Sequence, residues 1–237
     1  MVHGRRSWDG GIMSNIPMGV LSKVTQVVAL SLVHNSSSDA DSPGVTHTFT
    51  SVGFGAAASD RQIVVTIDGT NTLGGDIISS MVIGGVSATK VMGVTTTAGE
   101  IRQEIWYAAV PTGTSGTVTA TWNSAVSRNY IGVYRMTGAA TGATATASDV
   151  SGTGNLTGSL TIPANGGAVA LATAQGGPTC TWTNITERFE VKPASSNENK
   201  CGAMDNFEAA QSPLAITATL TSYPANEIMV CAAWGPG

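Results

Sequence analysis

Charged residues are scarce in this chain of 237 residues. Asp, Glu, Lys and Arg make up 11% of it, less than half of the roughly 25% that is usual for globular proteins. The net charge is -4 and there is no basic stripe, which excludes a nucleic-acid surface because such a surface needs Lys and Arg to displace counterions from phosphates. With 42% hydrophobic residues for a core, the surface must consist mostly of Thr, Ser, Gly and Asn. Sheet edges without charge are weakly protected against association, so this composition fits contact with partner chains and an ordinary hydroxyl-rich β protein equally well.

Long apolar runs and helical windows are lacking as well. No segment approaches the roughly eighteen apolar residues that cross a bilayer, so no membrane partner is expected. Residues 8–11, Trp-Asp-Gly-Gly, interrupt the N-terminus before the apolar core of an export signal could form, which predicts a protein made and kept in the cytoplasm of its host. Gly or β-branched residues interrupt every window long enough for three helical turns, and residues 205–211 are expected to be irregular.

Cysteine is rare, and the three residues have no C-x-x-C spacing. A zinc knuckle or a full disulfide framework is therefore not indicated. Cys231 lies in an apolar run and is expected to be a buried thiol. Cys180 and Cys201 lie in the most irregular stretches and are the candidates for one disulfide, within the chain or between chains.

What the sequence does contain is a period of two. In residues 117–122 and 214–221, apolar residues alternate with Thr, which is typical of strands with one buried face. Similar runs separated by Gly, Pro, Asn and Asp predict strands over residues 24–33, 45–52, 61–67, 76–83, 87–94, 100–110, 117–122, 128–136, 143–148, 156–162, 168–174, 179–191, 214–221 and 227–234, with a polar loop at 34–44. So many strands need two packed sheets. The predicted fold is all-β, a two-sheet antiparallel β-sandwich of jelly-roll-like or immunoglobulin-like type.

The N-terminus differs from the rest of the chain. Residues 1–20 have no helical or strand period, but they contain four large apolar residues, Trp8, Ile12, Ile16 and Met18. Disordered tails are poor in such residues, so we expect an extended arm that docks on its own domain or on a neighbour. The start codon could be Met1 or Met13. Residues 21–237 are expected to form the sandwich domain, with a subdivision near 138–155 as the alternative.

Catalytic constellations are hard to find. His3, His34 and His47 have no partner Ser or Cys in a strained turn and no second His at ligand spacing. Glu100 and Glu104 share a strand face, but Arg102 lies between them, which favours a surface charge ladder over a pair of catalytic acids. Glu187 and Glu190 are expected on opposite faces. The sequence thus predicts no enzyme activity and no cofactor.

Two loops and a few aromatic residues leave alternatives open. Residues 39–41 and 68–76 have the oxygen ligands of a calcium loop, although plain turns explain them better, and no metal is predicted. Trp122 alternates in phase with Val118 and Ala120 and is expected in the core. Among the other aromatic residues, Trp182, next to Cys180 in a loop-rich segment, is the tryptophan assigned to a surface role, such as stacking on a sugar.

Residues 45–138 resemble structural proteins of tailed phages and prophages, especially those of alphaproteobacterial hosts. The resemblance rests on Gly53-Phe54-Gly55-Ala56-Ala57 leading into Asp60-Arg61-Gln62-Ile63-Val64-Val65, on Val82-Ile83-Gly84-Gly85-Val86-Ser87-Ala88-Thr89, and on residues 105–118. It implies a non-enzymatic virion component, either a capsid-decoration protein or a tail or collar-associated protein. The first and last parts of the chain lie outside this resemblance.

The sequence therefore suggests a virion protein, assembled in the host cytoplasm, that decorates or stabilises a capsid. Its expected partners are the major capsid protein, or tail or collar subunits, and further copies of itself in a homo-oligomer. Trp8, Ile12, Ile16 and Met18 would anchor the arm. The alternative is a tail, collar or fibre component, or an adhesin-like module, that binds host-surface glycans through Trp182 and neighbouring loops.

Overall fold

The structure is a computed structural model that describes residues 28–70, 76–151, 154–192, 197–221 and 226–237. All sixteen elements of these residues are β-strands, and all their pairings are antiparallel. The strands of the first half are β1 (Ser31–Ala40), β2 (Gly44–Gly53), β3 (Gln62–Thr70), β4 (Ile78–Ile83), β5 (Val86–Ser87), β6 (Thr89–Thr95), β7 (Ile101–Ala109) and β8 (Ser115–Thr137). Those of the second half are β9 (Ala145–Ser151), β10 (Asn155–Ile162), β11 (Gly166–Gln175), β12 (Cys180–Thr183), β13 (Glu187–Val191), β14 (Glu198–Phe207), β15 (Gln211–Leu220) and β16 (Glu227–Trp234). The prediction of an all-β sandwich architecture is confirmed.

The first half is one eight-stranded sheet that folds over on itself. Its hinge is β8, which is 23 residues long. Residues 115–126 of β8 pair with β2 and β4, and residues 127–137 pair with β1 and β3. We call β2, β4, β5 and the first half of β8 the first outer layer. The first inner layer consists of β1, β3, β6, β7 and the second half of β8.

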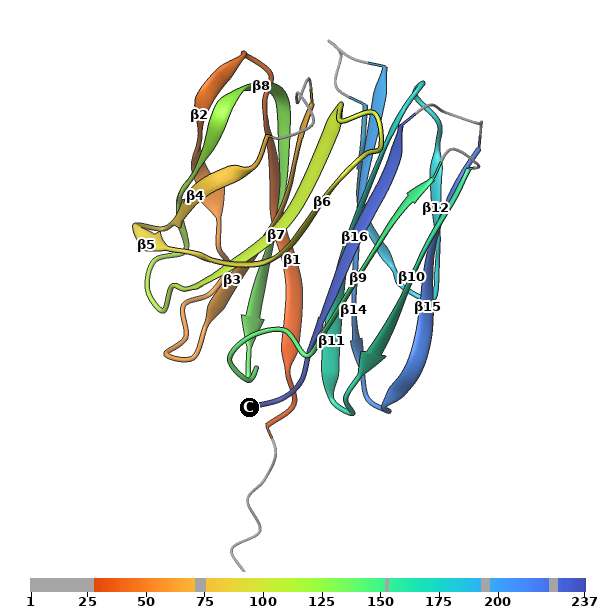
Figure 1. The fold of residues 1–237 in the computed structure, drawn as a ribbon. Coiled ribbons are helices and arrows are strands. Elements are labelled where there is room, and N and C mark those ends of the chain that lie inside the picture. The colour runs from red at the N-terminus through yellow and green to blue at the C-terminus, as the bar shows by residue number, and fades with distance from the viewer. Residues whose placement is uncertain (1–27, 71–75, 152–153, 193–196, 222–225) are drawn as a thin grey trace, which may run out of the picture.

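The second half consists of two separate sheets. The second inner layer has the strand order β13-β14-β11-β16-β9, and the second outer layer has the order β10-β15-β12. The chain passes from the first half to the second between β8 and β9. Figure 1 shows the four layers side by side, with the two inner layers in contact.

Three hydrophobic cores hold the layers together. The first lies inside the folded-over sheet and includes Trp106 and Trp122, and the second lies between the two sheets of the second half. The third joins the two inner layers and includes Tyr134 and Trp234. Because the inner layers have a core on each side, their central strands are buried on both faces; every residue of β16 is buried. The core position predicted for Trp122 is confirmed, since its side chain is 1% exposed.

Strand types follow from this layering. In β10, buried and exposed residues alternate strictly, as expected for an outer strand with one face on a core. In β11, nine of the ten residues are buried, with Val169 and Leu171 facing the third core and Ala168 and Ala170 facing the second. The alanines allow the second outer layer to pack closely on this strand.

Several predicted boundaries are wrong. The polar stretch predicted as a loop over 34–44 contains most of β1, because the second half of β8 offers this segment a full pairing partner despite its polarity. The two strands predicted over 117–122 and 128–136 form one continuous strand, β8, whereas the single strand predicted over 179–191 is divided into β12 and β13. Strand β14 was missed entirely, since its buried residues include Glu198, Asn199 and Lys200.

The described strands form three hydrogen-bonded sheets where the sequence indicated two. The predicted arm at residues 1–20 lies outside the described residues, so that prediction stands as it was made. The assignment of residues 21–237 to one domain, with a subdivision near 138–155 as the alternative, also stays a prediction.

Candidate functional site

The first outer layer presents a face without charge. Its strands contain no Asp, Glu, Lys or Arg. Pairing aligns the outward side chains in rows across the sheet, and two of these rows are Thr48-Thr119-Val82 and Thr46-Thr121-Ser80. The strands of a sheet lie about 4.8 Å apart, so the threonines form a regular array of hydroxyl and methyl groups. His47 is the titratable residue of this layer, and it points inward with its Nε2 atom 2.8 Å from the carbonyl oxygen of Gly44.

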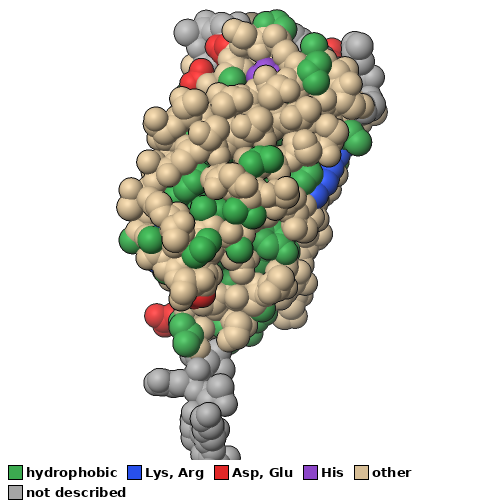
Figure 2. Space-filling view, turned by 90° about the vertical axis from the view of Figure 1, so that its left-hand side faces the viewer, with side chains coloured by type: hydrophobic (Ala, Val, Ile, Leu, Met, Phe, Trp, Pro, Cys, Tyr) green, Lys and Arg blue, Asp and Glu red, His purple; other side chains and the backbone are tan. Residues whose placement is uncertain are grey.

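Figure 2 views the molecule from the side of this layer. Uncharged polar and hydrophobic side chains form most of the visible surface, and the acidic and basic ones appear near its rim. Val45, Ile77 and Val86 are exposed large apolar residues of this layer and the chain leading into it. The face therefore combines hydroxyl groups with scattered apolar side chains, which is the composition of a surface that contacts another neutral surface.

The second outer layer, at the opposite end of the stack, has the same character. Strands β10, β12 and β15 contain no charged residue. Thr157 lies opposite Thr217, with their hydroxyl oxygens 3.0 Å apart, and Thr217 also lies opposite Thr183. At the end of the sheet the hydroxyl of Thr179 donates to that of Thr221 over 2.8 Å. We call these two surfaces the neutral faces.

The edges of the second outer layer are less accessible than its face. Strand β10 forms one edge, and there the backbone N–H of Thr157 donates to the carboxylate of Asp149 over 2.8 Å. Strand β12 forms the other edge, and there the N–H of Cys180 donates to Glu190 over 3.0 Å. A strand from another chain would meet a carboxylate at either edge, which disfavours edge-to-edge pairing. Association through the neutral faces is left as the simpler mode.

Charge lies inside the molecule, where the two inner layers meet. Lys200 on β14 pairs with Asp68 on β3 over 2.9 Å, and both side chains are buried. The hydroxyl of Thr173 on β11 donates to the same Asp68 oxygen over 3.0 Å and accepts a bond of 2.9 Å from the amide of Gln103 on β7. These contacts join the first half of the chain to the second.

The same cluster contains a second carboxylate and a second cation. Glu198 lies 3.3 Å from the Lys200 ammonium and accepts bonds from Arg128 over 3.0 Å and from Thr70 over 3.2 Å. We call the whole set the interface network; it consists of Asp68, Thr70, Gln103, Arg128, Thr173, Glu198 and Lys200. Its two acids and two cations balance, as buried charges must.

Burial has a clear effect on Asp68. It raises the pKa of this carboxyl above its ordinary value, and the attraction of Lys200 opposes the rise in part. A carboxylate held by a buried cation, a hydroxyl and the N–H of Tyr130 is an acceptor with its bonds filled. We interpret the interface network as a lock that fixes how the two halves pack.

A second buried carboxylate corrects a prediction. The surface ladder expected for Glu100, Arg102 and Glu104 is wrong, because Glu104 is 0% exposed. It accepts bonds of 2.8 Å each from Lys90, Arg102 and the indole N–H of Trp106. Both oxygens are thus engaged with donors, which makes Glu104 a structural ion-pair centre instead of a free general acid or base.

The seam between the halves also contains stacked aromatic rings. His34 lies 5.3 Å from Tyr134 and 5.4 Å from Phe189, measured between ring centroids. Burial lowers the pKa of His34 below its ordinary value. A cleft of about 400 Å³ opens beside it, lined by Leu32, Val33, His34, Arg188 and Met204. The Arg188 guanidinium is already bonded to the carbonyl of Met204 and to Asp205, so it offers little to a ligand.

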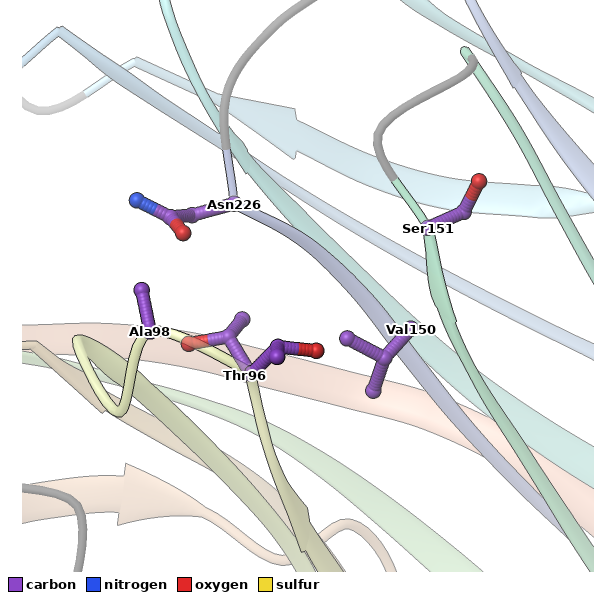
Figure 3. Close-up of a pocket in the computed structure, with 6 residues that line it drawn as sticks. Thr96, Ala98, Val150, Ser151 and Asn226 are labelled. Atoms are coloured by element: carbon purple, nitrogen blue, oxygen red, sulfur yellow. The ribbon is translucent and has the colours of Figure 1, made fainter.

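A larger pocket, of about 440 Å³, opens at one end of the seam. Its lining residues are Thr96, Thr97, Ala98, Val150, Ser151 and Asn226. Figure 3 shows Thr96 and Ala98, on the turn between β6 and β7, facing Val150 and Asn226 across the opening. The Asn226 amide donates to Gln175 over 2.9 Å and also to Glu100. The lining is neutral and carries hydroxyl and amide groups, which suits a small uncharged polar molecule.

The predicted surface role of Trp182 is not tested by its position. The side chain is half-buried and packs against the second core, and its indole nitrogen has no hydrogen-bond partner among the described residues. Cys180, Cys201 and Cys231 are all buried with free thiols, and burial raises the pKa of Cys231 to about 12. The buried thiol predicted at Cys231 is confirmed. The arm residues Trp8, Ile12, Ile16 and Met18 lie outside the described part of the chain.

Sequence reasoning missed the interface network and the neutral faces. The buried charges of β14 gave no alternating pattern, so neither the strand nor Lys200 could be found. The faces did leave a signal, since the uncharged Thr-rich strands fall into two groups along the chain, but the fold was needed to place each group on an outer surface.

Metal and membrane sites were also searched for. In the described ranges, no group of three or more His, Cys, Asp or Glu side chains could hold a metal ion. Part of the calcium-type loop at 68–76 lies outside those ranges, and its first residue, Asp68, is paired with Lys200. No helix in the described part of the chain is long and apolar enough to cross a bilayer.

Comparison with known proteins adds no family. No model of a protein family matches the chain, and no curated protein matches it either.

Proposed function

We propose that this protein is a non-enzymatic structural component of a phage virion that decorates or stabilises the capsid. The neutral faces carry this proposal. A protein that evolved to stay apart from its neighbours normally covers its outer sheets with Lys and Glu, whereas here the charged residues of the strands lie in the two inner layers.

The architecture supports the same proposal. Four stacked layers, three cores and the interface network make a stiff block, and each end of the block presents a neutral sheet. Such a block could contact a shell subunit with one face and a further copy of itself with the other. Weak contacts of this kind suffice on a lattice that offers many identical sites. The resemblance of residues 45–138 to virion proteins of tailed phages agrees with this use.

The test is binding to capsids. Capsids are prepared from a strain in which the gene for this chain is deleted, and the purified full chain is added before sedimentation. We expect saturable co-sedimentation that Thr119→Lys weakens at least tenfold, because the substitution leaves an unpaired charge inside a neutral contact. Thr119→Ser keeps the hydroxyl and is the matched control. Failure of the unmodified chain to bind these capsids would contradict the proposal.

A second candidate function is glycan binding by a tail, collar, fibre or adhesin-like module. The observation that favours it is the neutral pocket lined by Thr96, Ser151 and Asn226. Calorimetry with purified host surface polysaccharide would detect it. Loss of binding in Asn226→Ala would assign the pocket, and loss in Trp182→Ala would assign the neighbourhood of β12; no heat with the unmodified chain would exclude this function for that polysaccharide.

A further inference from the structure

Two of the three thiols face each other inside the second half. Cys180 lies on β12 of the second outer layer and Cys201 on β14 of the second inner layer, and both side chains belong to the second core. The two strands approach each other to within 8 Å between Cα atoms. The thiol of Cys180 is within hydrogen-bonding contact of that of Cys201. A disulfide needs Cα atoms about 4.4–6.8 Å apart with sulfur atoms directed at one another, and these positions come close to that arrangement.

We propose that Cys180 and Cys201 form a disulfide that joins the two sheets of the second half when the protein meets an oxidant. The remaining cysteine has a different environment: the Cys231 thiol donates to the carbonyl of Ala147 over 3.4 Å, on the side of β16 that pairs with β9. The specific pair, and not simply the presence of thiols, is what the fold selects. This inference holds whether the neutral faces bind a capsid or another partner.

The reaction can be written with a low-molecular-weight disulfide such as oxidised glutathione as the oxidant. The Cys180 thiolate attacks one sulfur of the reagent, which forms a mixed disulfide and releases one reagent thiolate. The Cys201 thiolate then attacks the Cys180 sulfur and releases the second reagent thiolate. Two electrons pass from the cysteines to the reagent, and the two protons lost by the cysteines are taken up by the two released thiols.

Burial makes this reaction slow in the folded protein. Cys180 is 4% exposed and Cys201 is fully buried, and burial raises the pKa of the Cys201 thiol well above its ordinary value. Because the thiolate is the reacting form, the link should form only when β12, a four-residue edge strand, opens from the core. The bond then closes a loop over residues 180–201 and restricts the unfolded chain.

The experiment uses the full chain, purified with reductant and then desalted. It is incubated with oxidised glutathione in a mildly alkaline buffer, without denaturant, and its intact mass is followed. We expect a loss equal to two hydrogen atoms and, after proteolysis without reductant, a peptide pair that links Cys180 to Cys201. Cys231→Ala is the matched control and should behave as the unmodified chain, whereas Cys201→Ala should stop at the mixed disulfide or not react.

Thermal unfolding gives a second readout. Oxidation should raise the unfolding midpoint of the unmodified chain and of Cys231→Ala, and a reductant should restore it. If Cys201→Ala fails to fold, Cys180→Ala at the edge strand replaces it. Three results would each overturn the proposal: both thiols still open to alkylation after oxidation, a link that involves Cys231, or a link between Cys180 and Cys201 that forms only in denaturant.

Discussion

Replacing Lys200 with methionine would remove the ammonium group that pairs with both Asp68 and Glu198. Methionine keeps most of the aliphatic stem, so the packing of the side chain changes little while its charge is lost. Asp68 would then be a buried carboxylate with a hydroxyl and two N–H groups near it and no cation at 2.9 Å. Glu198 would keep Arg128 as its partner.

The expected loss is large. Removing one partner of a buried ion pair typically costs about 3–5 kcal/mol, because the other charge stays buried without compensation. Both Asp68 and Lys200 are at most 1% exposed, so the full range applies near neutral pH. The loss should be smaller in acid, since Asp68 can then take up a proton. Urea unfolding followed by circular dichroism measures the change in the free energy of unfolding, and an unchanged slope shows that both variants unfold in the same way.

A double variant distinguishes a lock between the halves from an incidental contact. Asp68→Asn combined with Lys200→Met removes both charges, and we expect it to recover more than half of the loss. A loss below about 1 kcal/mol in Lys200→Met, which is the range of an exposed pair, would refute the reasoning. No recovery in the double variant would refute it as well, because the cost would then not arise from the unpaired Asp68 carboxylate.

Three further predictions concern other parts of the molecule. Burial raises the pKa of Asp68 above 3.8 in the folded chain, so the folded state binds this proton more tightly and the group's contribution to stability falls as pH rises; Asp68→Asn should flatten urea midpoints between about pH 4 and pH 7, and equal slopes would contradict this. Gly202→Ala should lower stability by about 1–3 kcal/mol, because its Cβ would meet the Phe189 ring, and Phe189→Leu should relieve the clash in thermal melts; no relief would show another cause. A chain without residues 1–20 should no longer co-sediment with capsids if the arm is the anchor, and unchanged binding would remove that role.

The outer strands were predictable because their environment is simple. In β10 and β15 one face lies on a core and the other meets solvent, so the period of two stands in the sequence itself. Trp122 could be assigned to a core for the same reason. Such strands report their own burial without reference to the rest of the fold.

The inner strands were harder because their residues answer to two neighbours at once. Strand β14 begins with Glu198, Asn199 and Lys200, all buried, since it contributes to the seam between the halves. A polar start of this kind is indistinguishable in sequence from a loop. The partners that neutralise Lys200 are Asp68, which is 132 residues earlier, and Glu198, so the pairing depends on the tertiary structure.

The candidate sites show the same division. The low charge of the surface was visible in the composition, and the thiols of Cys180 and Cys201 could be selected as a pair from their place in irregular stretches. That the uncharged strands occupy the two ends of a four-layer stack could not be seen, because the assignment depends on how β8 folds the first sheet over and how the inner layers pack. Glu104 was placed on the surface because its two cations, Lys90 and Arg102, could not be seen to enclose it.

The central claim is that this chain is a structural component of a virion, and its presence in particles tests that claim most directly. Particles released by a host that carries the gene would be purified on a density gradient and analysed by quantitative mass spectrometry against the major capsid protein. The account predicts that the chain bands with the particles in many copies, at a fixed ratio to the capsid subunit. Its absence from the particle band while it is abundant in the lysate would contradict the account.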